Sequence, residues 1–73
     1  MPVSFEFAYT LGISHGWSAA NFVDAYGGER QCPVEHSYGT SGGYESGWQE
    51  GWDRYRDDQW PDGTSRLDEH ELA

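Results

Sequence analysis

Two short-range pairs in this 73-residue sequence contain side chains that perform chemistry in other proteins. Cys32 and His36 lie four residues apart and are both zinc-ligand types, but a structural zinc site needs about four ligands. Ser14 precedes His15, a nucleophile type beside a base type, yet adjacent residues of a helix or strand do not face each other. Neither pair predicts a site, so we expect no enzymatic activity, no metal and no cofactor.

Carboxylates are the most abundant ionisable groups. Thirteen acidic residues stand against four arginines and no lysine, which gives a net charge of −9. Nine of the acidic residues lie in residues 41–73. Clustered carboxylates attract basic surfaces, and the commonest basic surfaces in a cell belong to proteins that hold DNA or RNA. The alternatives are acids that only maintain solubility and the acidic surface typical of a high-salt organism.

Trp60 is surrounded in sequence by aspartates. A tryptophan with a carboxylate rim binds a partner's lysine or arginine through cation–π contact and ion pairing, whereas the alternative role is to cover the open end of the core. The aspartates lack the spacing of a calcium loop, so we interpret them as a protein-binding surface. The predicted partner-binding residues are Glu45, Glu50, Asp53, Asp57, Asp58, Trp60 and Asp62.

The composition excludes several classes of protein. So few basic residues argue against a surface that binds phosphate groups, and no apolar stretch is long enough for a membrane span or a signal peptide. The single cysteine cannot form an intrachain disulfide and favours a reducing compartment, so we expect a cytoplasmic protein. Leu, Ile, Val and Phe are scarce, but four Trp and five Tyr indicate a folded domain. The sequence is compatible with a monomer or a homodimer.

The N-terminal element has two competing interpretations. Apolar residues alternate from Val3 to Leu11, and this period of two favours a half-buried strand that ends at Gly12. The rival interpretation is a helix through Tyr9, Gly12, Gly16 and Trp17. We favour the strand, and therefore an α+β fold: one small domain in which a short N-terminal β-segment packs on two main helices.

The two helices are expected near residues 17–27 and 43–59. Ser18 or Ser14 is the candidate cap of the first helix, and Gly27 is its stop. Residues 29–43 form a connection with room for a short strand at 34–38, and Pro61 ends the second helix in a turn. Residues 1–63 make the domain, and residues 64–73 make an acidic tail or a short helix. The predicted core contains Phe5, Phe7, Phe22, Val23, Trp48 and Trp52.

A motif recurs 35 residues apart. Tyr9-x-x-Gly12-x-x-x-Gly16-Trp17 is repeated as Tyr44-x-x-Gly47-x-x-x-Gly51-Trp52. Glycines destabilise a helix interior by about 1 kcal/mol each, so a packing role is expected for them. The pattern predicts two helices that cross at grooves formed by these glycines.

The order of these motifs resembles the ribosome modulation factor family. The shared features are the spaced Gly12 and Gly16, the pair Cys32-Pro33, and Trp48-x-x-Gly51-Trp52, over residues 8–56. The resemblance implies a related scheme of helix packing and gives ribosome association as an alternative function.

In size and charge the chain resembles the small acidic proteins that phages use against host defence, including anti-CRISPR proteins. Several of those imitate DNA and block the basic channel of a CRISPR effector. The function expected from the sequence is inhibition of a basic nucleic-acid-binding protein or complex by DNA mimicry, in the host cytoplasm if a phage encodes the chain. We expect no direct binding of nucleic acid or membrane, and a plain acidic interaction module is the last alternative.

Overall fold

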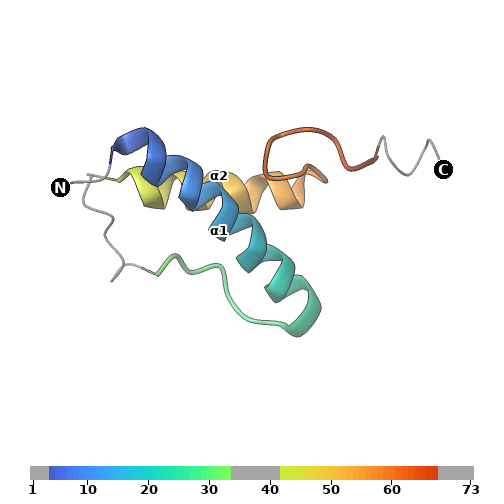
Figure 1. Ribbon diagram of the computed structural model, residues 1–73. Coiled ribbons are helices and arrows are strands. Elements are labelled where there is room, and N and C mark those ends of the chain that lie inside the picture. The colour runs from blue at the N-terminus through green and yellow to red at the C-terminus, as the bar shows by residue number, and fades with distance from the viewer. Residues whose placement is uncertain (1–3, 34–41, 68–73) are drawn as a thin grey trace.

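The computed structural model describes residues 4–33 and 42–67, which contain two α-helices, α1 (Phe5–Tyr26) and α2 (Gly43–Arg56) (Figure 1). Neither described range contains a β-strand, so the expectation of an α+β fold with an N-terminal strand is wrong. The short strand considered at residues 34–38 lies outside the described residues, as do His36 and residues 68–73.

Helix α1 begins twelve residues before the predicted start. The hydroxyl of Ser4 accepts a hydrogen bond from the Phe7 N–H at 3.1 Å, which caps the helix, and Glu6 lies in the first turn where a negative charge is favourable. Ser4 is therefore the cap, and neither Ser14 nor Ser18 is. The end of the helix was predicted correctly, because Gly27 adopts a positive φ of 90° and its N–H bonds to the Val23 carbonyl.

A row of small residues explains why the N-terminal segment is helical. Ala8, Gly12, Gly16 and Ala20 recur every four residues and are all buried, which places them on one face of α1. Of the bulky residues in the apolar alternation, Phe5 and Phe7 lie exposed away from this face, whereas Leu11 packs against the core cluster. The packing face of α1 consists of small residues rather than large apolar ones. The periodicity of the bulky apolar residues therefore predicted a strand where the chain forms a helix.

Helix α2 carries a matching row. Gly43, Gly47 and Gly51 recur every four residues and are buried beside Trp48 and Trp52. The helix begins at the predicted residue but ends at Arg56 rather than at residue 59, since Asp58 adopts a left-handed φ of 58° that a helix does not allow. Pro61 therefore lies beyond the end of α2 and does not cause it.

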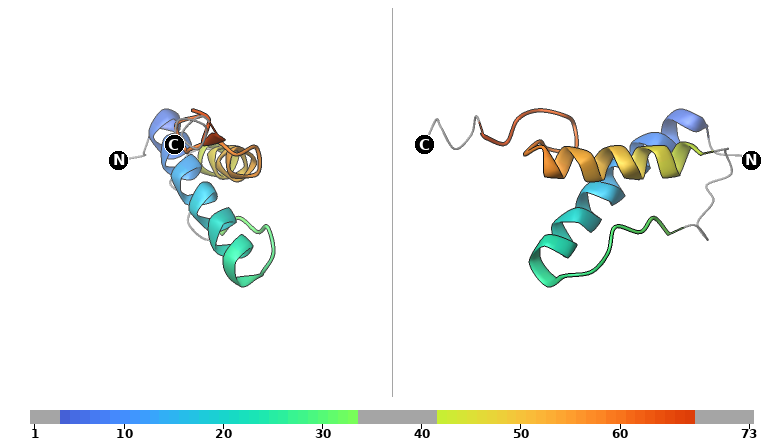
Figure 2. Two further views of the ribbon diagram at one scale, coloured as in Figure 1. Left: turned by 90° about the vertical axis from the view of Figure 1, so that its right-hand side faces the viewer. Right: turned by 180° about the vertical axis from the view of Figure 1, so that it is seen from behind.

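The two glycine rows meet where the helices cross (Figure 2). A Cβ atom added to Gly12 would overlap the Tyr44 carbonyl oxygen, and one added to Gly47 would overlap the equivalent oxygen of Tyr9. Gly47 is the counterpart of Gly12 in the repeated motif, and Tyr44 is the counterpart of Tyr9, so the two contacts are equivalent. The crossing therefore has an internal pseudo-two-fold symmetry, and the predicted packing role of the repeated motif is confirmed.

The next turn of the crossing repeats the same arrangement. A Cβ on Gly16 would overlap the Trp48 carbonyl oxygen, and a Cβ on Gly51 would overlap that of Ile13. Residue numbers increase together along both helices, so α1 and α2 run parallel, with their N-terminal ends on the same side (Figure 1). A parallel pair needs a connection that returns along the full length of the first helix. This explains why so many residues separate α1 from α2.

The core is small and lies around the crossing. Trp48 and Trp52 are buried as predicted, at 2% and 7% exposure, and Ala8, Ala20 and Tyr44 complete the cluster. Val23 packs against it and is half-buried.

Three predicted core residues are instead exposed. Phe5, Phe7 and Phe22 are 51%, 58% and 61% exposed. They lie away from the small-residue face of α1, and the described part of the chain has no sheet that would cover them. Phe5 stacks on Tyr9, and the Phe22 ring contacts the Tyr26 ring at a tilt of 45°, so each retains partial cover from its own helix.

Residues 57–67 turn back toward the helices. The Gly63 N–H bonds to the Trp60 carbonyl, which forms the turn predicted at Pro61-Asp62-Gly63. The Trp60 N–H bonds to the Thr64 carbonyl at 2.8 Å and closes the loop. Arg54 of α2 donates to the Pro61 carbonyl at 2.7 Å, so the loop is fixed to the end of the helix.

Candidate functional site

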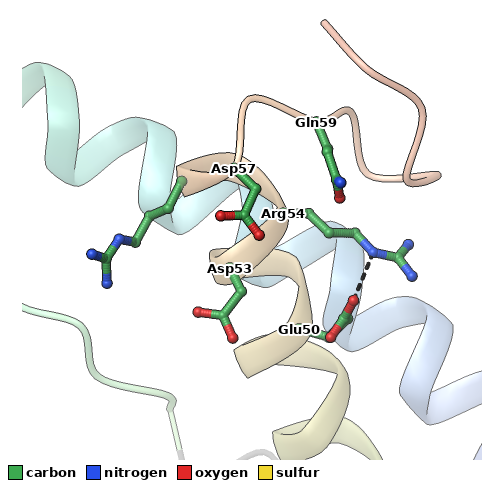
Figure 3. Close-up of a pocket in the computed structure, with 6 residues that line it drawn as sticks. Glu50, Asp53, Arg54, Asp57 and Gln59 are labelled. Atoms are coloured by element: carbon green, nitrogen blue, oxygen red, sulfur yellow. Dashed lines mark hydrogen bonds and ion pairs between the residues drawn. The ribbon is translucent and has the colours of Figure 1, made fainter.

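The outward face of α2, together with the capping residue Asp57 that follows its last residue, carries three of the predicted partner-binding acids. Glu50, Asp53 and Asp57 follow one another at spacings of three and four residues, which places them on the same side of the helix (Figure 3). Glu50 is ion-paired with Arg54, four residues further along the helix, at 3.0 Å. Asp53 is ion-paired with Arg30 of the connection at 3.0 Å.

These ion pairs change how much charge the face presents. Arg30 also donates to the Gln49 side chain and lies over the Trp52 ring, so it is held on α2 by several contacts. A polar hollow of about 440 Å³ lies on this face and is lined by Glu50, Asp53, Arg54, Arg56, Asp57 and Gln59 (Figure 3). The hollow mixes both signs of charge, so it is a weaker cation-binding surface than the sequence suggested.

Among the described residues, carboxylates without a salt bridge gather instead just past the end of α2. Asp57, Asp58 and Asp62 are exposed, and we call these three residues the acidic end. No arginine in residues 4–33 or 42–67 forms a salt bridge with any of them. They follow the C-terminus of α2, where the helix itself carries a partial negative charge, so they strengthen a field already present.

Asp62 is held in its charged form by the turn around it. The hydroxyl and the N–H of Thr64 both donate to its Oδ1 atom, at 2.7 and 2.9 Å. These bonds, that of the hydroxyl first, lower the pKa of the Asp62 carboxyl below its ordinary value. Glu45, the remaining predicted acid, is exposed near the opposite end of α2 and does not belong to the acidic end.

Trp60 belongs to an aromatic cluster beside the acidic end. Trp17 stacks on Trp60 with ring centroids 5.8 Å apart, and Tyr55 meets the edge of Trp17 at 5.2 Å. The guanidinium carbon of Arg66 lies over all three rings, at 5.2 to 5.6 Å from their centroids. We call Trp17, Tyr55 and Trp60 the aromatic cluster. The cation expected from a partner is thus supplied here by the chain itself.

Hydrogen bonds fix two members of the cluster. The Trp17 Nε1–H donates to the Gln59 carbonyl at 2.6 Å, and the Tyr55 hydroxyl donates to Asp24 Oδ2 at 2.7 Å. The bond to Asp24 is the main cause that raises the pKa of Tyr55. The Trp60 Nε1–H is buried and has no hydrogen-bond partner among the described residues, a state that typically costs about 1–3 kcal/mol.

His15 and Cys32 have structural positions. His15 Nδ1 is hydrogen-bonded to the Tyr44 hydroxyl at 2.7 Å, and the two rings meet edge to face, so this side chain links α1 to α2. Cys32 packs against the core cluster, where burial raises the pKa of its thiol, and the carboxylate of Glu45 adds to the rise. Its predicted neighbour His36 lies outside the described residues.

Sequence reasoning missed most of the aromatic cluster. Trp17, Tyr55 and Arg66 come from α1, α2 and the final loop, and only the fold brings them together. One signal was available. The turn at Pro61-Asp62-Gly63 reverses the chain, so a cation a few residues later returns toward Trp60.

In residues 4–33 and 42–67, no group of three or more His, Cys, Asp or Glu side chains is arranged to hold a metal ion. Neither described helix is long and apolar enough to cross a membrane.

Comparisons of the chain with protein-family models, with curated proteins and with solved structures find no significant match. Its role must therefore be inferred from its own residues and their geometry.

Proposed function

We propose that this chain is a non-enzymatic inhibitor that docks its acidic end on the basic, nucleic-acid-binding surface of another protein. The observation that carries the proposal is the group of exposed carboxylates of Asp57, Asp58 and Asp62 at the negative end of α2, none of which forms a salt bridge within residues 4–33 and 42–67. With a net charge of −9, the chain attracts and orients a basic partner before contact. The proposed place of action is the cytoplasm, and a phage anti-CRISPR protein that imitates DNA is one example of this type.

The structure supports a division of roles among the predicted acids. Glu50 and Asp53 are engaged by Arg54 and Arg30, so part of their charge is neutralised within the chain. Asp57 and Asp58 carry their charge into solvent, and the turn keeps Asp62 ionised. We therefore expect the acidic end to contribute most of the charge-dependent affinity, and Glu45, Glu50 and Asp53 to contribute less.

The test is capture of partners by tagged protein at low and high salt, with two variants of equal net charge. Asp57→Lys/Asp58→Lys reverses the acidic end. Glu6→Lys/Glu29→Lys makes the same change in charge at exposed positions elsewhere. We expect captured nucleic-acid-binding proteins to be lost with the first variant, retained with the second, and released by salt, because screening weakens charge steering.

Competition then separates mimicry from simple attraction. DNA or RNA should displace the protein from a purified captured target, and the protein alone should not bind either nucleic acid. Equal capture by both variants, or simultaneous binding of nucleic acid and this protein to the target, would overturn the proposal.

A second candidate function is association with the ribosome. The observation that favours it is that the motif glycines, Gly12, Gly16 and Gly51, make the helix crossing, and that Cys32 packs on the core of a two-helix chain. This is the packing scheme that the resemblance to the ribosome modulation factor family implies. An acidic chain would there bind basic ribosomal proteins rather than RNA.

Sedimentation distinguishes the two candidates. A ribosome-associated chain should travel with ribosomes through a sucrose gradient at low salt, whereas an inhibitor of another complex should remain at the top of the gradient. Tagged wild-type protein added to a cell lysate provides the measurement, and Asp57→Lys/Asp58→Lys shows whether the same acidic end is used.

A further inference from the structure

We propose that the aromatic cluster is a binding site for an arginine side chain of a protein partner, and that Arg66 is its internal occupant. The claim that a partner fills the site rests on the proposed function, whereas the chemistry of the site does not. Arg66 shows which ligand the cluster accepts, because its guanidinium lies within 5.6 Å of three ring centroids. Aromatic faces at this distance attract a cation through their quadrupoles.

The contacts of Arg66 differ from those of the other paired arginines. In the described part of the chain, Arg30 and Arg54 form salt bridges with carboxylates, whereas Arg66 lies over rings. A guanidinium on rings is held without a bidentate carboxylate, and the side-chain hydrogen bond of Arg66 to Tyr55 is one that another guanidinium can also make. The cluster therefore recognises a class of side chain rather than one residue.

The Arg66 side chain can rotate out of the cluster while its backbone stays in place, because a bridge between Gln59 and Ser65 holds the segment beside it. Arg66 lies at the end of the loop that follows α2, and its backbone N–H bonds to the Asp58 carbonyl at 2.8 Å. Neighbouring Ser65 and Leu67 are exposed. Rotation of this side chain would open the cluster while the helix crossing, which depends on Gly12, Gly16, Gly47 and Gly51, stays closed.

The surroundings of the cluster favour a basic partner. Trp60 is followed within two residues by Asp62, and Asp57 and Asp58 precede it, so an arginine that approaches the rings first meets the acidic end. Long-range attraction and short-range recognition thus lie at one end of the molecule. An arginine of the partner would fill the site that Arg66 leaves, in the way that buried aromatic and arginine anchors dominate many interfaces.

The test uses the full chain and a defined probe. The peptide acetyl-Gly-Arg-Gly-amide is titrated into wild-type protein and into Arg66→Ala, with tryptophan fluorescence as the readout. The matched peptide in which citrulline replaces arginine has nearly the same shape and no charge. Arg56→Ala is the control variant, because it removes an arginine that lies outside the cluster.

We expect Arg66→Ala to bind the arginine peptide at least about tenfold more tightly than wild type, since the apparent affinity of wild type is the intrinsic affinity multiplied by the small fraction of molecules whose site is empty. Arg56→Ala should match wild type, and the citrulline peptide should bind none of them. Equal affinity of wild type and Arg66→Ala, or equal binding of both peptides, would overturn the proposal.

A second variant and the wild type keep the test informative if Arg66→Ala does not fold. Arg66→Met keeps the apolar stem and removes the charge, and far-ultraviolet circular dichroism reports whether the helices persist. If both variants lose helical signal, the titration of wild-type protein decides whether the cluster binds the arginine peptide. Saturable quenching by the arginine peptide alone supports the site, and its absence refutes it. Loss of the peptide site with normal capture of basic partners would refute this inference and leave the proposed function standing.

Discussion

Trp17 and Trp60 stack on each other, but their indole N–H groups differ in hydrogen bonding. That of Trp17 donates to the Gln59 carbonyl, and that of Trp60 is buried without an acceptor among the described residues. Trp17→Phe should therefore lower the free energy of unfolding by about 1 kcal/mol more than Trp60→Phe, because only the first loses a hydrogen bond. Urea unfolding followed by circular dichroism gives the comparison. Equal losses would show that the two N–H groups are equally satisfied.

Tyr55 makes stability depend on alkaline pH. Its bond to Asp24 raises the pKa of the phenol above the ordinary value of 10.0, so the protonated phenol favours the folded state. This contribution is fully present below about pH 10 and is lost as the pH rises through the folded pKa. Tyr55→Phe should flatten this part of the decline in the melting temperature above about pH 10.

The control for this experiment is Tyr26→Phe, which removes an exposed phenol of α1. It should leave the alkaline profile close to that of wild type. If the profile of Tyr55→Phe also equals that of wild type, the bond to Asp24 does not contribute to stability.

At the scale of the helices, the close contact at the glycines of the crossing predicts how alanine substitutions there change stability. Alanine normally stabilises a helix by about 1 kcal/mol relative to glycine. At Gly16 and Gly51 the added methyl would overlap a backbone carbonyl, which cannot rotate away as a side chain can. Either substitution should instead destabilise the protein by roughly 2 kcal/mol, which is about 10 °C in melting temperature for a chain of this size.

Ser14→Ala provides the matched control, because this position is exposed on α1 and gains helix propensity without a clash. It should leave the melting temperature unchanged or raise it slightly. A rise for Gly16→Ala or Gly51→Ala as well would mean that the helices do not approach each other at these residues.

The sequence predicted α2 well and α1 in part. In α2, Trp48 and Trp52 recur at helical spacing beside glycines, and both the first residue and the buried face were found. In α1 the packing face consists of Ala8, Gly12, Gly16 and Ala20, whose small side chains give a weak apolar signal. The alternating bulky residues gave a stronger signal for a strand, although two of them, Phe5 and Phe7, remain exposed.

The candidate site was predictable as a region but not as an arrangement. The aspartates and Trp60 are adjacent in sequence, so their proximity needed no fold. The pairing of Asp53 with Arg30 joins segments 23 residues apart, and no local rule links them. Contacts that arise only from the return of the connection and of the last loop could not be read from spacing.

At the scale of the whole molecule, the net charge of −9 opposes folding through self-repulsion. Screening shortens the reach of charge interactions from about 30 Å at 0.01 M salt to about 10 Å at 0.1 M. The melting temperature should therefore rise when sodium chloride is added, and it should rise less for Asp57→Lys/Asp58→Lys. Differential scanning calorimetry at low salt measures both effects. A melting temperature that falls with salt would show that internal ion pairs outweigh repulsion.

The close approach of the two backbones at the glycines also affects how stability varies with temperature. Carbonyl oxygens and glycine Cα atoms occupy space that larger apolar side chains fill in other helix pairs. Exposure of apolar surface raises the heat capacity of unfolding, whereas exposure of polar backbone lowers it. The heat-capacity change should thus fall below the usual range of about 12–15 cal/mol/K per residue. The curve of free energy against temperature should then be shallow, so that cooling costs this protein little stability.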